Sequence, residues 1–168
     1  MEKLQIKGFW EVVHKDKFGK IKSIEFVKNL VTNEGQNYLL NAAAHGGTQI
    51  STWYFAPFVD NYTPLVTNTY ATPGYTEGSA QYDEATRQEW TEGAASGQAV
   101  TNAVAATITA NTDVTIYGSG IVGGGSAAST KGDAAGGGTL LSSAKFATAK
   151  TLANGETLDM TYTLSTSN

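Results

Sequence analysis

The stretch TLDMTYTL, residues 157–164, decides the fold class. Apolar and polar residues alternate along it one by one, and the apolar set is Leu158, Met160, Tyr162 and Leu164. Because successive side chains of a β-strand point to opposite faces, this alternation predicts a strand with one buried face and a threonine-rich outer face. The dipeptide Asn154-Gly155 just before it is typical of a tight hairpin turn. We therefore expect a β-protein whose last strand is half-buried.

A similar alternation recurs upstream of this stretch. It predicts strands over residues 100–108, 114–122 and 139–148, with a turn at 111–113. Together with the last strand these make four strands, which we expect to form two hairpin-like pairs. Residues 123–138 read GGGSAASTKGDAAGGG, a composition that predicts a loop that is mobile in the free protein and costly to order.

The N-terminal part contains two apolar runs, 3–13 and 20–31, on either side of the loop sequence KDKFG. These runs predict a long β-hairpin over residues 1–31. Apolar residues occur at odd and even positions of both runs. We therefore expect either that both faces of the hairpin are covered in places or that a bulge lies near Gly8.

One helix is predicted after the hairpin, over residues 33–46. Asn33 followed three residues later by Gln36 fits a capping box, and Gly46 with Gly47 supplies a C-terminal stop. Since one short helix cannot form a layer of its own, we expect it to cover one end of the sheets.

An aromatic strand is predicted next, within residues 50–59. Adjacent strand residues face opposite sides, so either Trp53 and Phe55 lie in the core with Tyr54 outside, or the reverse. The outward set would then be covered by another subunit or by the long loop at 60–98. That loop contains five aromatic residues, which predicts an ordered conformation.

These elements predict a mainly β fold, an antiparallel β-sandwich that is jelly-roll-like, with an N-terminal β-hairpin and one short helix. With 168 residues the chain is expected to form a single domain, in which residues 50–168 make the sandwich. An immunoglobulin-like sandwich is the alternative, but the chain lacks the cysteines of that fold's signature.

The composition argues against several classes of protein and site. The chain contains no cysteine, which excludes disulfides and cysteine-ligated zinc. It has no run of 18 apolar residues, so no membrane-spanning helix is expected. The N-terminal sequence MEKLQIKGFWEVVHKDKFGK is charged where a secretion signal would be apolar, so no such signal is expected.

Charge is distributed unevenly along the chain, whose formal net charge is −4. Residues 1–35 carry seven lysines against five acidic residues, and residues 36–168 carry four basic against ten acidic residues. The lysines of the hairpin either meet an acidic surface or protect an exposed strand edge. Because the overall charge has the wrong sign and no dense basic cluster exists, no nucleic acid is expected as a partner.

No motif in the chain predicts catalysis or cofactor binding. Residues 118–123, GSGIVG, match GxGxxG, but the glycines that follow cannot start the required helix, so we interpret them as a strand of small residues. His14 and His45 share no metal-binding pattern. We expect His14 on the hairpin surface and His45 at the helix C-terminus, with no metal and no cofactor.

Four acidic residues cluster in the long loop, namely Asp83, Glu84, Glu89 and Glu92. We interpret them as an exposed acidic segment paired to Arg87, with one helical turn at 83–88. Two carboxylates held about 5–9 Å apart also suit a glycosidase, and Glu84 with Glu89 would be that pair. The first interpretation is favoured and predicts that the protein is not an enzyme.

The order of segments over residues 33–168 resembles that of small accessory virion proteins of tailed bacteriophages, which decorate or cement the capsid. The resemblance rests on the helix, the aromatic strand STWYFAPF, the loop sequences YTPLVTNTYATPGYTE and YDEATRQEW, and the strands TNAVAATITANTDVTIYGSGIV and GGGTLLSSAKFATAKTLANGETLDMTYTLS. Most of the resemblance lies in the pattern of these segments and not in invariant motifs. It implies a jelly-roll-like fold, no catalysis, and self-association, with a trimer favoured.

The resemblance also implies a place in the virion. The protein would be made in the host cytoplasm and would bind the major capsid protein or another virion protein on the outer surface of the capsid. The alternative is a tail-associated or host-surface adhesin whose aromatic loop residues stack on sugars. The candidate contact residues are Lys3, Lys7, Phe9, Trp10, Tyr54, Tyr70, Tyr75, Tyr82, Arg87 and Trp90.

Overall fold

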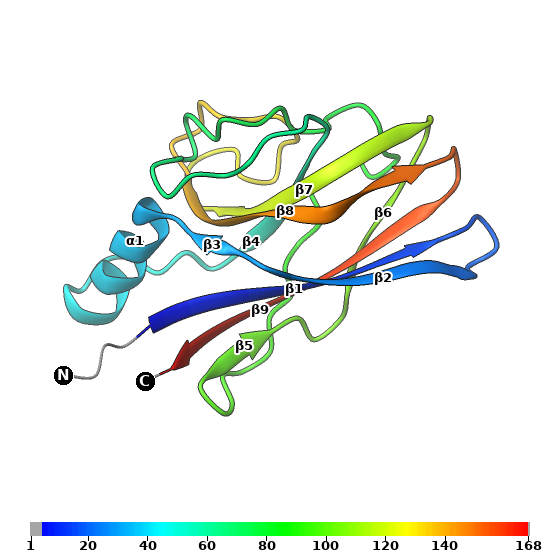
Figure 1. Ribbon diagram of the computed structural model, residues 1–168. Coiled ribbons are helices and arrows are strands. Elements are labelled where there is room, and N and C mark those ends of the chain that lie inside the picture. Colours follow the sequence, from blue (N-terminus) through cyan, green and yellow to red (C-terminus); the bar gives the residue numbers. More distant parts are fainter. Residues whose placement is uncertain (1–4, 168) are drawn as a thin grey trace.

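The computed structural model describes residues 5–167, which form two antiparallel β-sheets and one helix (Figure 1). The first sheet contains β1 (Gln5–Lys15), β2 (Ile21–Lys28), β5 (Ala99–Thr101), β6 (Ala106–Thr109) and β9 (Thr157–Ser167). The second sheet contains β3 (Leu30–Val31), β4 (Trp53–Phe58), β7 (Val114–Gly123) and β8 (Thr139–Leu152). The helix, α1, spans Asn33–Ala44. The predicted mainly β, antiparallel sandwich with an N-terminal hairpin and one short helix is confirmed.

The strand that contains TLDMTYTL, β9, lies inside the first sheet. It pairs with β1 along its whole length on one side, and with β5 and β6 on the other. Leu158, Met160 and Tyr162 are fully buried, whereas the residues of the other face are partly exposed; they are Thr157, Asp159, Thr161 and Thr163. The predicted buried and threonine-rich faces are therefore confirmed.

The strands β6 to β9 form one long hairpin that is folded over on itself. β7 pairs with β8 in the second sheet, and β6 pairs with β9 in the first sheet in the same register. At the corner between the sheets, the N–H of Gly155 donates to the carbonyl of Ala110 at 2.7 Å. Gly155 has φ +84°, a conformation that glycine adopts without strain. The Asn154-Gly155 turn therefore joins the two sheets. The two expected pairs are β7 with β8 and β6 with β9, and the Asn154-Gly155 turn does not pair β9 with β8.

The N-terminal hairpin of β1 and β2 is present as predicted, but its irregularity is elsewhere. The register shifts between His14 and Lys15, at the loop end, and not near Gly8. Gly8 is required because a Cβ atom there would lie 2.2 Å from the side chain of Asn29. After Asn29 the chain enters the second sheet as β3, so the predicted second strand of the hairpin is divided between the two sheets.

The helix α1 packs against β8 at one end of the sandwich, as Figure 1 shows. Its N-cap is Thr32 and not Asn33, because the Thr32 side chain accepts a hydrogen bond from the N–H of Gly35 at 2.9 Å. Gly35 is buried, and a Cβ atom there would lie 2.2 Å from the carbonyl oxygen of Leu141. Among the described residues, no helix is long and apolar enough to cross a membrane.

The core between the sheets is built around aromatic rings. Trp10 makes edge contact with Phe55 at 5.4 Å between centroids, and Tyr162 lies between Trp10 and Trp90 at 5.1 Å from each. The indole N–H of Trp90 donates to the carbonyl of Tyr162 at 3.1 Å. Because Trp90 belongs to the long loop, this loop completes the core instead of lying over it.

The strand β4 settles which aromatic residues face the core. Trp53 and Phe55 are buried in it, so the first of the two predicted alternatives is right. Tyr54 is partly exposed and packs on the other face of the sheet, against a small cluster that includes Tyr70 and Leu140. The outer face of β4 is thus covered by the chain's own loop.

Residues 76–96, which we call the edge segment, run along one open side of the sandwich. Against β4, the N–H of Phe55 donates to Gln88 O and the N–H of Trp90 donates to Trp53 O, both at 2.8 Å. Against the first sheet, the N–H of Gly93 donates to the carbonyl of β5 residue Thr101 at 2.9 Å. The predicted helical turn at 83–88 is absent, because these backbone groups pair with the sheets instead.

Candidate interaction surface

An apolar surface lies on the outer side of the N-terminal hairpin. We call it the hairpin face, and its residues are Phe9, Val13, Ile21, Ile24 and Phe26. The register places these five side chains on the side of β1 and β2 that points away from the core. Phe9 is 43% exposed and Phe26 is 61% exposed, although both are large and apolar. Exposed apolar residues gathered on one face mark an interaction site more often than scattered ones do.

The two phenylalanine rings of the hairpin face stack on each other. Their centroids are 5.7 Å apart and their planes differ by 15°. The exposed lysines Lys7 and Lys28 flank this pair on β1 and β2. The arrangement is a mainly apolar surface that is interrupted by Glu11, opposite Phe26, and bordered by lysines. It suits a partner surface that is apolar at its centre and acidic at its edge.

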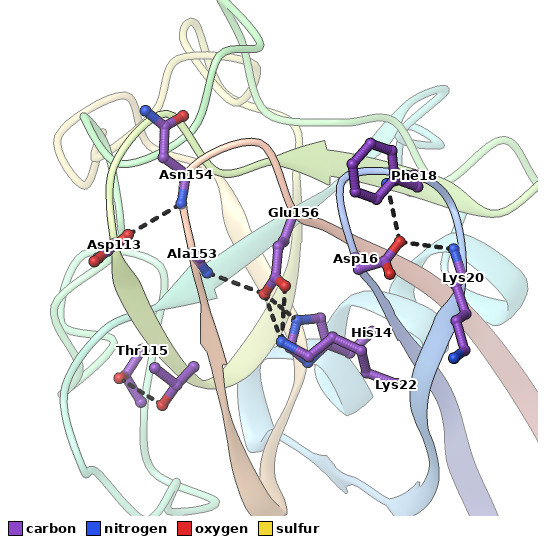
Figure 2. Close-up of polar contacts among 11 residues, drawn as sticks. His14, Asp16, Phe18, Lys20, Lys22, Asp113, Thr115, Ala153, Asn154 and Glu156 are labelled. Atoms are coloured by element: carbon purple, nitrogen blue, oxygen red, sulfur yellow. Dashed lines mark hydrogen bonds and ion pairs between the residues drawn. The ribbon is translucent and has the colours of Figure 1, made fainter.

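The hairpin loop presents a further apolar side chain (Figure 2). Asp16 accepts hydrogen bonds from the backbone N–H groups of Phe18 and Lys20, both at 2.9 Å, and Gly19 has φ +82°. These bonds fix the turn with the Phe18 ring 84% exposed. The ammonium of Lys17 lies 5.2 Å from the centroid of that ring.

A polar cluster around Glu156 fixes the loop end of the hairpin to the corner that joins the two sheets, as Figure 2 shows. The Glu156 carboxylate lies 2.8 Å from His14 Nε2 and accepts bonds from Lys22 Nζ at 2.7 and 2.9 Å and from the N–H of Ala153 at 3.0 Å. The hydrogen bond from Lys22 and that from the Ala153 N–H lower the pKa of Glu156 to about 2. His14 is buried, so its predicted surface position is wrong.

The structure separates the ten predicted contact residues into different places. Lys7 and Phe9 are exposed, Tyr54 is partly exposed, and Lys3 lies outside the described residues. The other six are at most 8% exposed and present little surface to a partner; they are Trp10, Tyr70, Tyr75, Tyr82, Arg87 and Trp90. Trp10 packs in the core between the sheets, and the other five belong to the long loop and pack it on the sandwich.

Arg87 is the centre of a buried network between two loops. Its guanidinium donates to both oxygens of Glu77, at 2.6 and 2.9 Å, and to the hydroxyl of Tyr70 at 3.2 Å. It also donates to the carbonyls of Ala128 and Asp133, both at 2.8 Å. The predicted acidic partner in segment 83–92 is wrong, because Glu77 takes that place. The glycine-rich loop at 123–138 is thereby anchored to Arg87.

The two acidic residues of the glycosidase alternative have different surroundings. The Glu84 carboxylate accepts bonds from the N–H of Thr109 at 3.0 and 3.1 Å, whereas Glu89 is exposed on the edge segment. No group of three or more potential metal ligands occurs in residues 5–167.

The GSGIVG motif lies within β7, and a Cβ atom on Gly118 would lie 2.2 Å from the carbonyl oxygen of Ala144. Its interpretation as a strand of small residues is confirmed.

A pocket of about 630 Å³ lies between α1 and the edge segment. Tyr38, Trp53, Trp90 and Leu141 line its floor, and Glu92 is its acidic residue. Trp53 and Trp90 are only 6% and 3% exposed, so little of each ring is available to a ligand. We therefore place the candidate site on the hairpin face and not in this pocket.

Comparison with known proteins supplies no family for the chain: no family model and no curated protein matches it. The site therefore rests on the geometry. Sequence reasoning identified Phe9 but missed its neighbours Ile21, Ile24 and Phe26. The signal for them was present, because apolar residues at both odd and even positions of a hairpin imply an apolar outer face.

Proposed function

We propose that this chain is a structural virion protein that decorates or cements the capsid of a tailed bacteriophage. The observation that carries the proposal is the hairpin face, where Phe9 and Phe26 are stacked and exposed within a rim of lysines. The resemblance in segment order supports the same function. The partner is the major capsid protein or another virion protein on the outer surface of the capsid, which the chain meets after its synthesis in the host cytoplasm.

The mechanism is the burial of apolar surface between neighbouring subunits. A protein that binds the assembled shell but not its separated subunits stabilises the shell by mass action. The hairpin face supplies the apolar centre of such an interface, and Lys7 and Lys28 supply its polar rim. No catalytic step is part of this function, and that the protein is not an enzyme stays a prediction.

Cosedimentation with undecorated capsids tests the proposal. We expect the purified chain to add to the shells in a fixed ratio and to raise their melting temperature. Phe9→Ser and Phe26→Ser should weaken this binding at least tenfold, whereas Val104→Ser, a change of a 71% exposed residue away from the hairpin face, should not. Absence of binding by the unchanged chain would contradict the proposed function, and equal binding by all variants would contradict the assigned face.

The alternative of a glycan-binding adhesin has less support. It requires aromatic rings on which a sugar can stack, and the four loop residues that were to supply them are at most 8% exposed; they are Tyr70, Tyr75, Tyr82 and Trp90. A glycan array distinguishes the two functions. Selective glycan binding that Trp90→Ala abolishes without unfolding the chain would favour the adhesin.

A further inference from the structure

One long strand edge of the sandwich has no backbone partner among the described residues. The edge segment closes β4, β5 and β6 on one side. On the opposite side, β3 covers part of β8, and the Glu25 carboxylate accepts bonds from the N–H groups of Ala147 and Thr148, where the register of β8 is irregular. The outer edge of β2 remains, and within residues 5–167 no hydrogen bond to its outward backbone groups is formed.

The register identifies which β2 groups point outward. The N–H of Asn29 donates to the carbonyl of Gly8, and hydrogen-bonded pairs alternate along an antiparallel ladder. The residues at positions 27, 25 and 23 therefore bond to β1. Ile24, Phe26 and Lys28 direct their N–H and C=O groups away from the sheet, so three donors and three acceptors are offered to another strand.

We propose that β2 pairs with β2 of a second copy of this chain, antiparallel and around a two-fold axis that passes through Phe26. An antiparallel ladder between two identical strands is self-complementary, as a two-fold interface requires. This pairing joins the two first sheets into one continuous sheet. It replaces the trimer that the resemblance implied, and it does not depend on docking to a capsid.

Charge disfavours one of the two neighbouring registers. With Phe26 opposite Phe26 of the partner copy, Ile24 lies opposite Lys28 and Glu25 lies opposite Val27, so no like charges face each other. A shift by two residues places Lys22 opposite Lys28 and Glu25 opposite Glu25, and like charges directly opposite destabilise a ladder. The lysines at the ends of β2 therefore exclude that shift and do not prevent the pairing itself.

The exposed aromatic rings of the hairpin face become one row in this dimer. Phe9 already stacks on Phe26 within one chain. Across the axis, Phe26 meets the same residue of the second copy, so four rings follow one another on the outer face. Aromatic pairs across strands are among the favourable contacts of sheets. The dimer would thus present a docking surface twice as long as that of one chain.

The oligomeric state in solution is the first test. Sedimentation velocity of the full chain should give the mass of a dimer. Ile24→Pro removes only an outward N–H, and proline is tolerated on an edge strand when its N–H side faces away from the sheet, so this variant should be folded and monomeric. Phe18→Ala, a control on the loop, should remain dimeric. A monomer at all concentrations, or a trimer, for the unchanged chain would overturn the proposal.

Cross-linking tests the register and does not depend on the proline variant. The chain has no cysteine, so single cysteines report one position each. Two copies of Phe26→Cys place their thiols on strands whose Cα atoms are about 5.5 Å apart, and a short bis-maleimide should link them. Two copies of Ile24→Cys are offset by roughly 14 Å along the strand and should not link. Ile24→Cys mixed with Lys28→Cys should link. Equal linking of Ile24→Cys and Phe26→Cys would exclude this register.

Discussion

The ammonium of Lys150 on β8 lies 2.6 Å from a carboxylate oxygen of Glu25 on β2, and this ion pair joins the two sheets on the side opposite the edge segment. The Lys150 side chain is only 4% exposed and the Glu25 side chain 13%. The same carboxylate accepts the backbone bonds of the irregular part of β8. Glu25 therefore neutralises the buried Lys150 ammonium and also accepts hydrogen bonds from two backbone N–H groups of β8.

Glu25→Ala should lower the free energy of unfolding by about 3 kcal/mol, because it leaves the Lys150 ammonium buried without a partner. Lys150→Met should cost less, since it removes the buried charge itself and leaves Glu25 with its two backbone donors. Urea denaturation followed by tryptophan fluorescence measures both changes. Glu11→Ala, on the outer face of β1, is the matched control. Equal losses for Glu25→Ala and Glu11→Ala would contradict this role.

The stability of the protein should fall in acid because of Glu156. Its pKa of about 2 in the folded chain is below the ordinary value of 4.5, so the folded state binds the proton less tightly than the unfolded state. The stabilisation is fully present above about pH 4.5 and is lost as the pH falls towards 2. Glu156→Gln should weaken this dependence. Unfolding free energies measured between pH 6 and pH 2 test it, and identical slopes for the two chains would contradict it.

Changes on the hairpin face and in the core should differ sharply in their effect on stability. Phe26→Ser removes an exposed ring and should change the free energy of unfolding by no more than about 0.5 kcal/mol. Trp10→Ala removes a fully buried ring and should cost about 3–5 kcal/mol. Thermal unfolding of both variants checks this contrast. A large loss for Phe26→Ser that does not depend on protein concentration would show that the ring serves folding and not a partner.

Gly35→Ala should destabilise the protein although alanine favours helices more than glycine does. The added Cβ atom would lie 2.2 Å from the carbonyl oxygen of Leu141, so α1 must move away from β8. We expect a loss of about 1–3 kcal/mol, which is typical of overpacking. The control is Gly46→Ala. A Cβ atom there meets no other atom within 4 Å, so any loss comes from the φ of +70° and not from a close contact. A higher melting temperature for Gly35→Ala would contradict the close helix–sheet contact.

The sequence predicted those parts of the fold that depend on short-range pattern. Alternation in 157–164 identified both faces of β9, and the adjacent aromatic residues of β4 were assigned to two alternatives of which one is right. Such patterns are local because side-chain direction along a strand alternates with every residue.

The parts that could not be predicted depend on which strands meet in space. The Asn154-Gly155 turn has the composition of a hairpin, yet it joins two sheets, because the partners of β9 are β1, β5 and β6. His14 was expected on the surface, and its burial depends on Glu156, which is 142 residues away. The edge segment likewise has no strand pattern of its own, since its backbone follows sheets formed by other parts of the chain.

The pairing of β1 with β9 has a consequence for how the chain is made. Gln5 lies opposite Ser167, so the first and last described strands are neighbours in one sheet. During synthesis the early hairpin of β1 and β2 emerges from the ribosome long before its partner, and its inner face has no sheet to join. The five-stranded sheet therefore assembles only after β9 has left the ribosome. Until then the face of Trp10 that β9 covers in the folded chain lacks that cover, and exposed apolar surface of this kind promotes aggregation.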